Sequence, residues 1–152
     1  MISIRHATDA DSAAARSLIE SVMVGEFQMT NGMAASPDLV KLSDSYGGKR
    51  DLFMVAEKDG EIIGTVAIKE DSQEVALLRR IFIHKDHRGK GYGDSLLSEA
   101  LDYCAEQGYQ TVMFRGTDQM KTAIRLCSSR GFEEDDVAVI GDMTMVIMSK
   151  TL

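Results

Sequence analysis

The sequence predicts one domain of mixed α and β structure, with a central sheet that is mostly antiparallel and contains one parallel pair of strands. Asp59-Gly60 and Gly141-Asp142 each lie between two strand-like runs, and such pairs are typical of hairpin turns. Residues 73–114 have a strand–helix–strand pattern, a connection that joins parallel strands. The 152 residues suit a single domain (1–152), because no linker rich in glycine or serine divides them.

The first fifty residues predict a short strand, a helix and an irregular segment. Residues 2–5 alternate between apolar and polar side chains, as a half-buried strand does. Asp9 or Asp11 can cap the following helix, because a short carboxylate accepts hydrogen bonds from free N–H groups. Residues 25–50 are polar, with only a weak helix near 38–46, so we expect an irregular binding surface there. The apolar face of the first helix would consist of Ala14, Ala15, Leu18, Ile19 and Val22.

The middle of the chain predicts three strands and a second helix. The strands fall at residues 51–57, 62–69 and 73–84. The helix runs from about Gly93 to Gln107, and Gly108 ends it. Its buried face would consist of Leu96, Leu97, Ala100, Leu101 and Cys104.

The last part of the chain predicts a strand, a third helix and a closing hairpin. The strand covers residues 110–114, and Asp118 can cap the helix that follows. Gly131 ends that helix in the left-handed conformation that glycine tolerates. The hairpin would pair residues 132–140 with 144–148. The apolar helix face would consist of Met120, Ala123, Ile124 and Cys127.

Composition and charge argue against several classes of protein. The formal net charge of −7 is unusual for a nucleic-acid binder, which is more often basic. No apolar run approaches the roughly 20 residues of a membrane helix, and the N-terminus has no apolar signal region. Cys104 and Cys127 form neither a disulfide framework nor a metal quartet, and His84 and His87 have no clear third ligand. We therefore expect a cytoplasmic protein without a metal, a membrane or a nucleic acid as partner.

The most informative stretch is Arg88-Gly89-Lys90-Gly91-Tyr92-Gly93, which follows a predicted strand and opens a predicted helix. Glycines there let backbone N–H groups converge on an anion, and a helix N-terminus adds free donors. The surrounding cations are Arg79, Arg80, Lys85, Arg88 and Lys90, opposed only by Asp86. A phosphate ligand explains this concentration, although the dinucleotide and P-loop motifs are both absent. The alternative is a tight turn with solvated charges.

Arg88-x-x-Gly91-x-Gly93 resembles the R/Q-x-x-G-x-G/A signature of the GCN5-related N-acetyltransferases. The resemblance continues through Asp51–Ile68 and Ala76–Ile83, which look like the second to fourth strands of that family. Ala123-Ile124-Arg125-Leu126 followed by Gly131-Phe132 resembles a later family segment, and Ile4-Arg5-x-Ala7-x-x-x-Asp11 matches a common start. Together these segments cover nearly the whole chain in the family's order.

The resemblance implies an acetyl-CoA-dependent N-acetyltransferase that acts by direct attack of an amine in a ternary complex. The acceptor would be a small amine or a peptide amine, and relatives are often homodimers. The backbone of Ile81, Phe82 and Ile83 would pair with the pantetheine arm like an added strand. The pyrophosphate would be held by the backbone amides of Arg88, Gly89, Lys90, Gly91, Tyr92, Gly93 and Asp94, and Lys85, Arg88 or Lys90 could reach the sugar phosphate.

The chain departs from the family at both positions that usually move protons. Leu77 stands where many relatives have a glutamate base, and Cys127 stands where they have a tyrosine acid. The helical spacing favours core packing for Cys127. Ser128 and Glu74 are further weak catalytic candidates, and Glu57 and Glu70 could also route a proton through water.

Two alternatives to an enzyme follow from these departures. One is a non-catalytic acyl-CoA-binding regulatory module, and the other is a phosphate-binding interaction domain without preference for CoA. On the acceptor side, Met23, Met29 and Met33 could line an adaptable pocket, although ordinary core filling also explains them. The acidic run at residues 133–136 could attract a polyamine-like acceptor, although a solvated loop also explains it.

Overall fold

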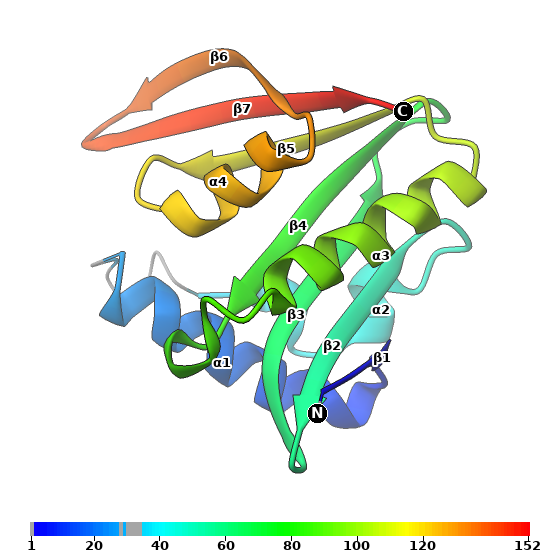
Figure 1. Ribbon diagram of the computed structural model, residues 1–152, viewed down its shortest axis with the longest axis vertical. Helices are drawn as coiled ribbons and strands as arrows, with labels where there is room; N and C mark the ends of the chain where they lie inside the picture. Colours follow the sequence, from blue (N-terminus) through cyan, green and yellow to red (C-terminus); the bar gives the residue numbers. More distant parts are fainter. Residues whose placement is uncertain (1, 28, 30–34) are drawn as a thin grey trace.

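The computed structural model describes residues 2–27, 29 and 35–152, and within them seven strands form one sheet in the order β1-β2-β3-β4-β5-β7-β6 (Figure 1). Every neighbouring pair is antiparallel except β4 and β5, which are parallel. This topology confirms the predicted fold class. The strands are β1 (Ser3–His6), β2 (Leu52–Lys58), β3 (Glu61–Glu70), β4 (Val75–Ile83), β5 (Thr111–Thr117), β6 (Glu133–Ile140) and β7 (Met143–Thr151).

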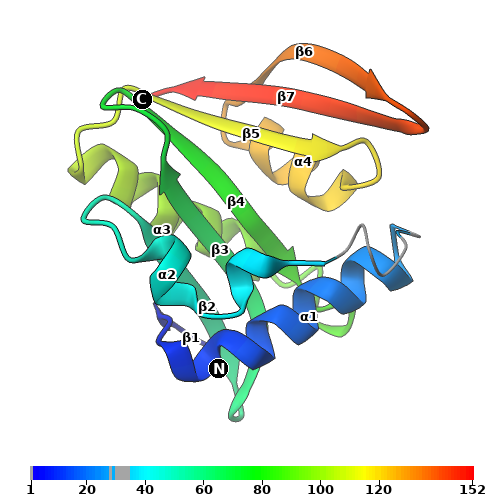
Figure 2. The same cartoon turned by 180° about the vertical axis from the view of Figure 1, so that it is seen from behind.

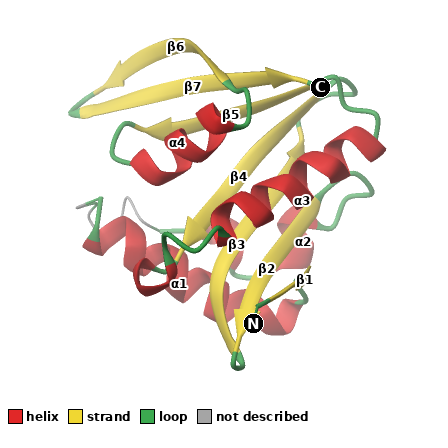
Figure 3. Ribbon diagram, in the orientation of Figure 1, coloured by secondary structure: helices red, strands yellow, loops and turns green. Residues whose placement is uncertain are grey.

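Helices cover both faces of the sheet (Figures 1 and 2). Helices α3 (Tyr92–Glu106) and α4 (Lys121–Ser129) lie on one face, while α1 (Ser12–Gly25) and α2 (Leu42–Tyr46) lie on the other. Figure 3 shows that α3 connects the two parallel strands. Three short 3-10 turns complete the described elements: η1 (Asp9–Asp11), η2 (Pro37–Leu39) and η3 (Lys85–His87). None of the described helices is long and apolar enough to cross a membrane.

Each face of the sheet has its own core, because alternate residues of a strand point to opposite faces. Ala76, Leu78 and Ile81 of β4 pack in the core under α3 and α4, whereas Phe82 packs in the core under α1. All five residues predicted for the buried face of α3 are buried. The predicted face of α1 is also buried, except for Ala14, which faces solvent.

One predicted helix cap is wrong and another is formed one turn earlier than α1. Asp118 lies in the turn before α4, and the residue that precedes the helix is Met120, which makes no side-chain cap. Asp11 makes no cap to the backbone of α1, but it forms a capping box with Thr8 at the start of η1, which leads directly into α1. Its carboxylate accepts from the backbone N–H of Thr8 at 2.8 Å and from both terminal nitrogens of Arg5 at 2.8 and 2.9 Å. Asp11 therefore ties the start of α1 to strand β1.

A β-bulge interrupts β4 at its middle. Thr65 of β3 pairs with Phe82, and Ala67 pairs with Arg79, so two residues of β4 oppose one residue of β3. Arg80, one of the two, has a φ of +52°, a conformation that costs an L-residue about 1–2 kcal/mol. Its carbonyl accepts from the Thr65 hydroxyl at 2.7 Å, which holds the bulge in place.

An ion pair across the molecule also holds the bulge. The Arg80 guanidinium donates to the Asp38 carboxylate at 3.0 and 2.5 Å, and Tyr46 donates its hydroxyl to the same carboxylate at 2.7 Å. Burial alone would raise the pKa of Asp38, but the hydrogen bonds from Arg80 and Tyr46 hold that pKa below its ordinary value. Asp38 is therefore a carboxylate at neutral pH, and it fixes Arg80 to the segment between α1 and α2.

The two parallel strands separate at the bulge. Strand β4 pairs with β5 only from Val75–Thr111 to Leu78–Phe114, whereas β5 continues along β7 as far as Thr117. Figure 1 shows β4 and β5 diverging beyond this point, with α4 beside the gap. Within the described residues, the far half of β4 consequently has no strand partner on its β5 side.

We predict that Thr65→Val destabilises the fold, because it removes the side-chain donor to the Arg80 carbonyl without changing the volume of a fully buried residue. The expected loss is about 1–2 kcal/mol of unfolding free energy, measured by urea denaturation. Thr117→Val is the matched control, because the buried Thr117 hydroxyl has no hydrogen-bond partner among the described residues. Equal stabilities of the two variants would contradict the role of Thr65.

Candidate functional site

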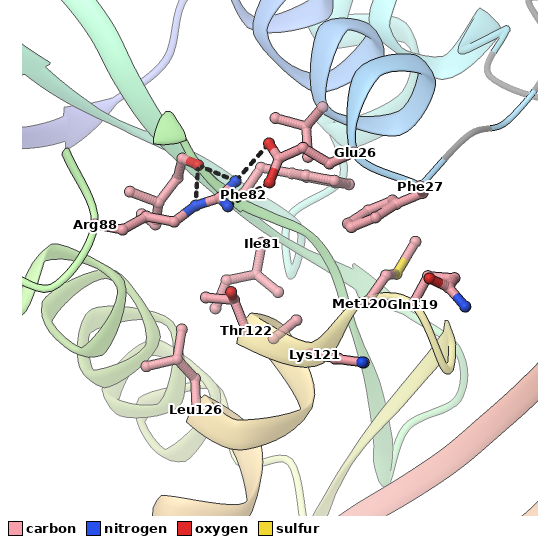
Figure 4. Close-up of a pocket in the computed structure, with 13 residues that line it drawn as sticks. Glu26, Phe27, Ile81, Phe82, Arg88, Gln119, Met120, Lys121, Thr122 and Leu126 are labelled. Carbon is pink, nitrogen blue, oxygen red and sulfur yellow. Dashed lines mark hydrogen bonds and ion pairs between the residues drawn. The ribbon is translucent and has the colours of Figure 1, made fainter. Parts of the chain in front are cut away.

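A cleft of about 300 Å³ occupies the gap beside the open half of β4. We call it the β4–α4 cleft. Figure 4 shows Ile81 of β4, Thr122 and Met120 at the start of α4, and Phe27 after α1 around this space. The full lining consists of Val22, Glu26, Phe27, Ile81, Phe82, Ile83, Arg88, Gln119, Met120, Lys121, Thr122, Ala123 and Leu126.

A second hollow of about 260 Å³ lies at the N-terminus of α3. We call it the glycine-loop hollow. It shares Ile83, Arg88, Thr122 and Leu126 with the β4–α4 cleft, so the two form one continuous depression. Its other lining residues are His87, Gly89, Gly91, Tyr92, Gly93, Asp94 and Arg125. The predicted strand segment and the predicted glycine loop therefore meet in one site.

The backbone of the loop leaves open space and N–H donors at the start of α3. Gly89 and Gly91 have φ of +76° and +83°, and an added Cβ at either would meet no atom within 4 Å. Gly91 precedes α3, and the first helical hydrogen bond runs from the N–H of Ser95 to its carbonyl. The N–H groups of residues 92–94 therefore have no partner inside the helix and are free to donate to a ligand.

Gly93 has a different role from the other two glycines. A Cβ at Gly93 would lie 2.7 Å from Cδ1 of Leu126 and 3.4 Å from Cγ1 of Ile83. The absence of a side chain therefore lets α3 pack closely against α4 and β4. A larger residue at Gly93 would disturb this packing before it could block a ligand.

The predicted cation cluster divides between two places. Arg88 donates to the Ile83 carbonyl at 3.1 and 2.9 Å, and it forms a two-pronged ion pair with Glu26 at the end of α1 (Figure 4). Its guanidinium is therefore engaged with the protein and joins β4 to α1. Arg79 and Arg80 lie at the bulge rather than at the loop, because the bulge directs them toward Asp38.

Three exposed cations remain at the loop. Lys85 and Lys90 make no hydrogen bond or ion pair within the described part of the chain. Arg125 of α4, which sequence reasoning did not include, lines the glycine-loop hollow. His87 also lines it, and its Nδ1 is buried without a hydrogen-bond partner among the described residues. Within those residues no group of three or more histidine, cysteine or acidic side chains could hold a metal ion.

None of the three weak catalytic candidates lines the continuous depression. Cys127 is fully buried, and burial raises the pKa of its thiol to about 12. Ser128 is exposed on the outer side of α4. Glu74 precedes β4 at the paired end of the strands, where its carbonyl accepts from the N–H groups of Gln110 and Thr111. The structure does not bring these residues to the cleft.

The residues that sequence reasoning missed come from the ends of helices. Glu26, Phe27, Gln119 and Thr122 enter the cleft from the end of α1 and the start of α4. The polar composition of residues 25–50 was the one available signal for the first two. For α4, the apolar spacing identified the buried face but gave no indication that Met120 and Ala123 of that face, together with Thr122 and Leu126 beside it, line a cleft.

The predicted acceptor features have mixed outcomes. Met23 is buried in the α1 core, where its sulfur lies 3.8 Å from a terminal nitrogen of Arg80. Met29 packs against the same core, and Met33 lies outside the described residues. The acidic run at 133–136 is exposed, but it belongs to strand β6 and not to a loop.

Comparison with known proteins identifies the same family along most of the chain. The model of the acetyltransferase (GNAT) family matches residues 19–132. The chain is 25% identical over 141 residues to a probable N-acetyltransferase, camello, of Xenopus tropicalis, which covers 89% of this chain and 64% of that protein. It spans about half the length of other curated relatives that it matches.

Solved structures share the fold. A GNAT-family acetyltransferase from Staphylococcus aureus superposes with a TM-score of 0.85 at 21% identity, over 99% of each chain. The yncA protein of Salmonella typhimurium, solved with its cofactor acetyl-CoA, superposes with a TM-score of 0.81 at 21% identity, over 99% of this chain and 93% of that one.

We predict that neither cysteine reacts in the folded protein. Burial raises the pKa of both Cys104 and Cys127 to about 12, so both thiols stay protonated at pH 8. The reactive thiolate would form only at strongly alkaline pH. Ellman's reagent should therefore detect no thiol in the native protein and two in urea. Rapid reaction of one thiol in the native protein would show that solvent reaches it.

Proposed function

The chain belongs to the acetyltransferase (GNAT) family, and from this premise we propose that it transfers an acetyl group from acetyl-CoA directly to an amine. The observation that carries the proposal is the continuous depression, which joins an unpaired strand edge to the N-terminus of a fifteen-residue helix. A CoA molecule has the matching parts, a pantetheine arm with two amides and a pyrophosphate.

The glycine loop fits the pyrophosphate. Gly89 and Gly91 leave open space where other residues would carry a Cβ, and the N–H groups of residues 92–94 have no intrahelical partner. We assign this role to the backbone from Arg88 to Asp94. Lys85, Lys90 and Arg125 are the exposed cations that would hold the further phosphate, since Arg88 is engaged with Glu26.

The open edge of β4 fits the pantetheine arm. Ile81, Phe82 and Ile83 line the cleft and follow the last residue of β4 that pairs with β5. An arm laid along this edge would satisfy its amides with backbone groups, as an added strand does. The Ile83 carbonyl is already occupied by Arg88, so we assign the pairing to the other backbone groups of these residues.

The side chains support direct transfer without an acyl-enzyme intermediate. A covalent route needs a nucleophile activated by a neighbouring base. Cys127 is buried, un-ionised and outside the cleft, and Ser128 faces solvent. The amine would therefore attack the bound thioester itself, so that a C–N bond forms, the C–S bond breaks and CoA leaves as a thiolate that takes a proton from water. The proton that the amine loses would pass to water in the open cleft, because Leu77 has no proton-accepting group.

One observation favours a second candidate function. Because Cys127, Ser128 and Glu74 all lie outside the depression, the same cleft could bind acyl-CoA without catalysis. The discriminating experiment is release of CoA thiol from acetyl-CoA with a panel of amines. An enzyme releases thiol only with suitable amines, whereas a binding module is stabilised by acetyl-CoA and releases none.

We predict that Gly91→Ala weakens CoA binding at least tenfold, or about 1.4 kcal/mol, because the new Cβ occupies the approach to the helix N-terminus. Isothermal titration with CoA measures the affinity. Gly108→Ala is the matched control. Gly108 also has a positive φ, of +81°, and open space around its missing Cβ, but it lies at the opposite end of α3. If both variants bind CoA equally well, the loop has been assigned the wrong role.

We also predict that Cys127→Ala lowers the maximal transfer rate less than tenfold, whereas loss of a general acid costs about 10²–10⁴. Its main effect should be a loss of stability on the order of 1 kcal/mol, because the sulfur is packed in the core. The rate should be followed against pH with any amine that the thiol-release panel identifies. A hundredfold loss in a folded variant would assign catalysis to the thiol.

A further inference from the structure

A third hollow of about 150 Å³ lies where β4 and β5 separate. We call it the arginine hollow. It shares Ile81, Phe82 and Met120 with the β4–α4 cleft, so it adjoins the segment that we assign to the pantetheine arm. Its remaining lining residues are Leu78, Arg79, Arg80, Phe114 and Arg115, and none of its lining side chains is acidic.

The three arginines project from the same face of the sheet. Arg79 and Arg80 both reach Asp38, at 4.0 and 2.5 Å, because the bulge turns two consecutive residues toward α1 and α2. Phe114 packs in the core under α3 and α4, so its neighbour Arg115 points to the opposite face, as the arginines of β4 do. The gap between the two strands is therefore lined by cations from both sides.

One carboxylate cannot neutralise these three charges. Asp38 accepts two hydrogen bonds from Arg80 and one from Tyr46, and it contacts Arg79 only at 4.0 Å. Arg79 keeps 42% of its side chain exposed. Arg115 is exposed, and its side chain makes no hydrogen bond or ion pair with any described residue. Two guanidinium groups therefore have donors to spare in a chain whose net charge is −7.

We propose that the acceptor is an amine that also carries a carboxylate, which Arg79 and Arg115 bind in the arginine hollow. This inference rests on the proposed acetyl transfer. A guanidinium binds a carboxylate through two parallel hydrogen bonds, so it fixes the orientation of the acceptor as well as attracting it. With the carboxylate held between the strands, the amine of the same molecule is directed toward Ile81 and Met120, where the two hollows adjoin.

The same charges oppose a polyamine acceptor. The exposed acidic run on β6 would attract a polycation to the surface, but Arg79 and Arg115 would repel it at the entrance between the strands. The proposal therefore selects amino acids and related amino carboxylates over diamines and polyamines.

The test compares matched pairs of amines, such as an L-amino acid and its amide, together with spermidine. Amidation lowers the pKa of the α-amine and raises its nucleophilic fraction, so a preference for the free acid cannot arise from amine reactivity. We expect kcat/KM to favour the free acid at least about tenfold, mainly through KM. An equal or higher kcat/KM for the amide or spermidine would overturn the inference and leave acetyl transfer intact.

Arg115→Gln should reduce the ratio of kcat/KM for the free acid to kcat/KM for the amide toward one. Arg115→Lys should retain part of this preference. Arg16→Gln is the control, because Arg16 is a similarly exposed arginine on α1 that pairs with Glu20 away from all three hollows. An unchanged acid-to-amide ratio in Arg115→Gln would contradict the proposal.

A binding readout separates failure of this inference from failure of the proposed function. N-acetylated amino acids and their amides are titrated calorimetrically into the protein saturated with CoA. If the acids bind, and Arg115→Gln weakens their binding at least about tenfold, the carboxylate site is supported even if no amine is acetylated. Absence of acid binding to the CoA complex would overturn it.

Discussion

The bulge in β4 at Arg80 is the constraint on which the site depends. A regular strand would pair with β5 beyond Leu78 and leave no gap between them. The extra residue ends this pairing at the cost of a positive φ for a bulky side chain, about 1–2 kcal/mol. Two interactions offset that cost. The Thr65 hydroxyl, within the sheet, donates to the Arg80 carbonyl, and the Asp38 carboxylate, in the segment before α2, accepts from the Arg80 guanidinium.

The bulge connects the two halves of the proposed reaction. Beyond it, the edge of β4 is open for the donor, and at it two consecutive arginines reach the acceptor side. Arg88 completes the arrangement because it holds the end of β4 and the end of α1 together through Ile83 and Glu26. The segments that we assign to donor binding and to acceptor selection, and the end of α1, are thus held by contacts of one strand.

Local patterns in the sequence predicted the parts of the structure that local physics determines. The hairpins, the buried face of α3 and the glycine loop follow from turn chemistry and periodicity, and all three are present. The bulge was not predicted, because Arg79-Arg80 lies between apolar runs that together look like one regular strand. Asp38, the partner of Arg80, lies about forty residues earlier in the chain. The sequence therefore predicts one phosphate site for the whole cation cluster, whereas the structure places Arg79 and Arg80 in a different hollow.

In the proposed donor site, the opened edge of β4 and the glycine loop together bind one CoA molecule. A crystal structure of the chain with CoA tests it most directly. We expect the pyrophosphate at the backbone N–H groups of residues 88–94 and the pantetheine arm beside Ile81–Ile83, with β4 and β5 still separated beyond Leu78. CoA bound outside this depression, or β4 paired with β5 along its whole length, would show that this binding mode is wrong.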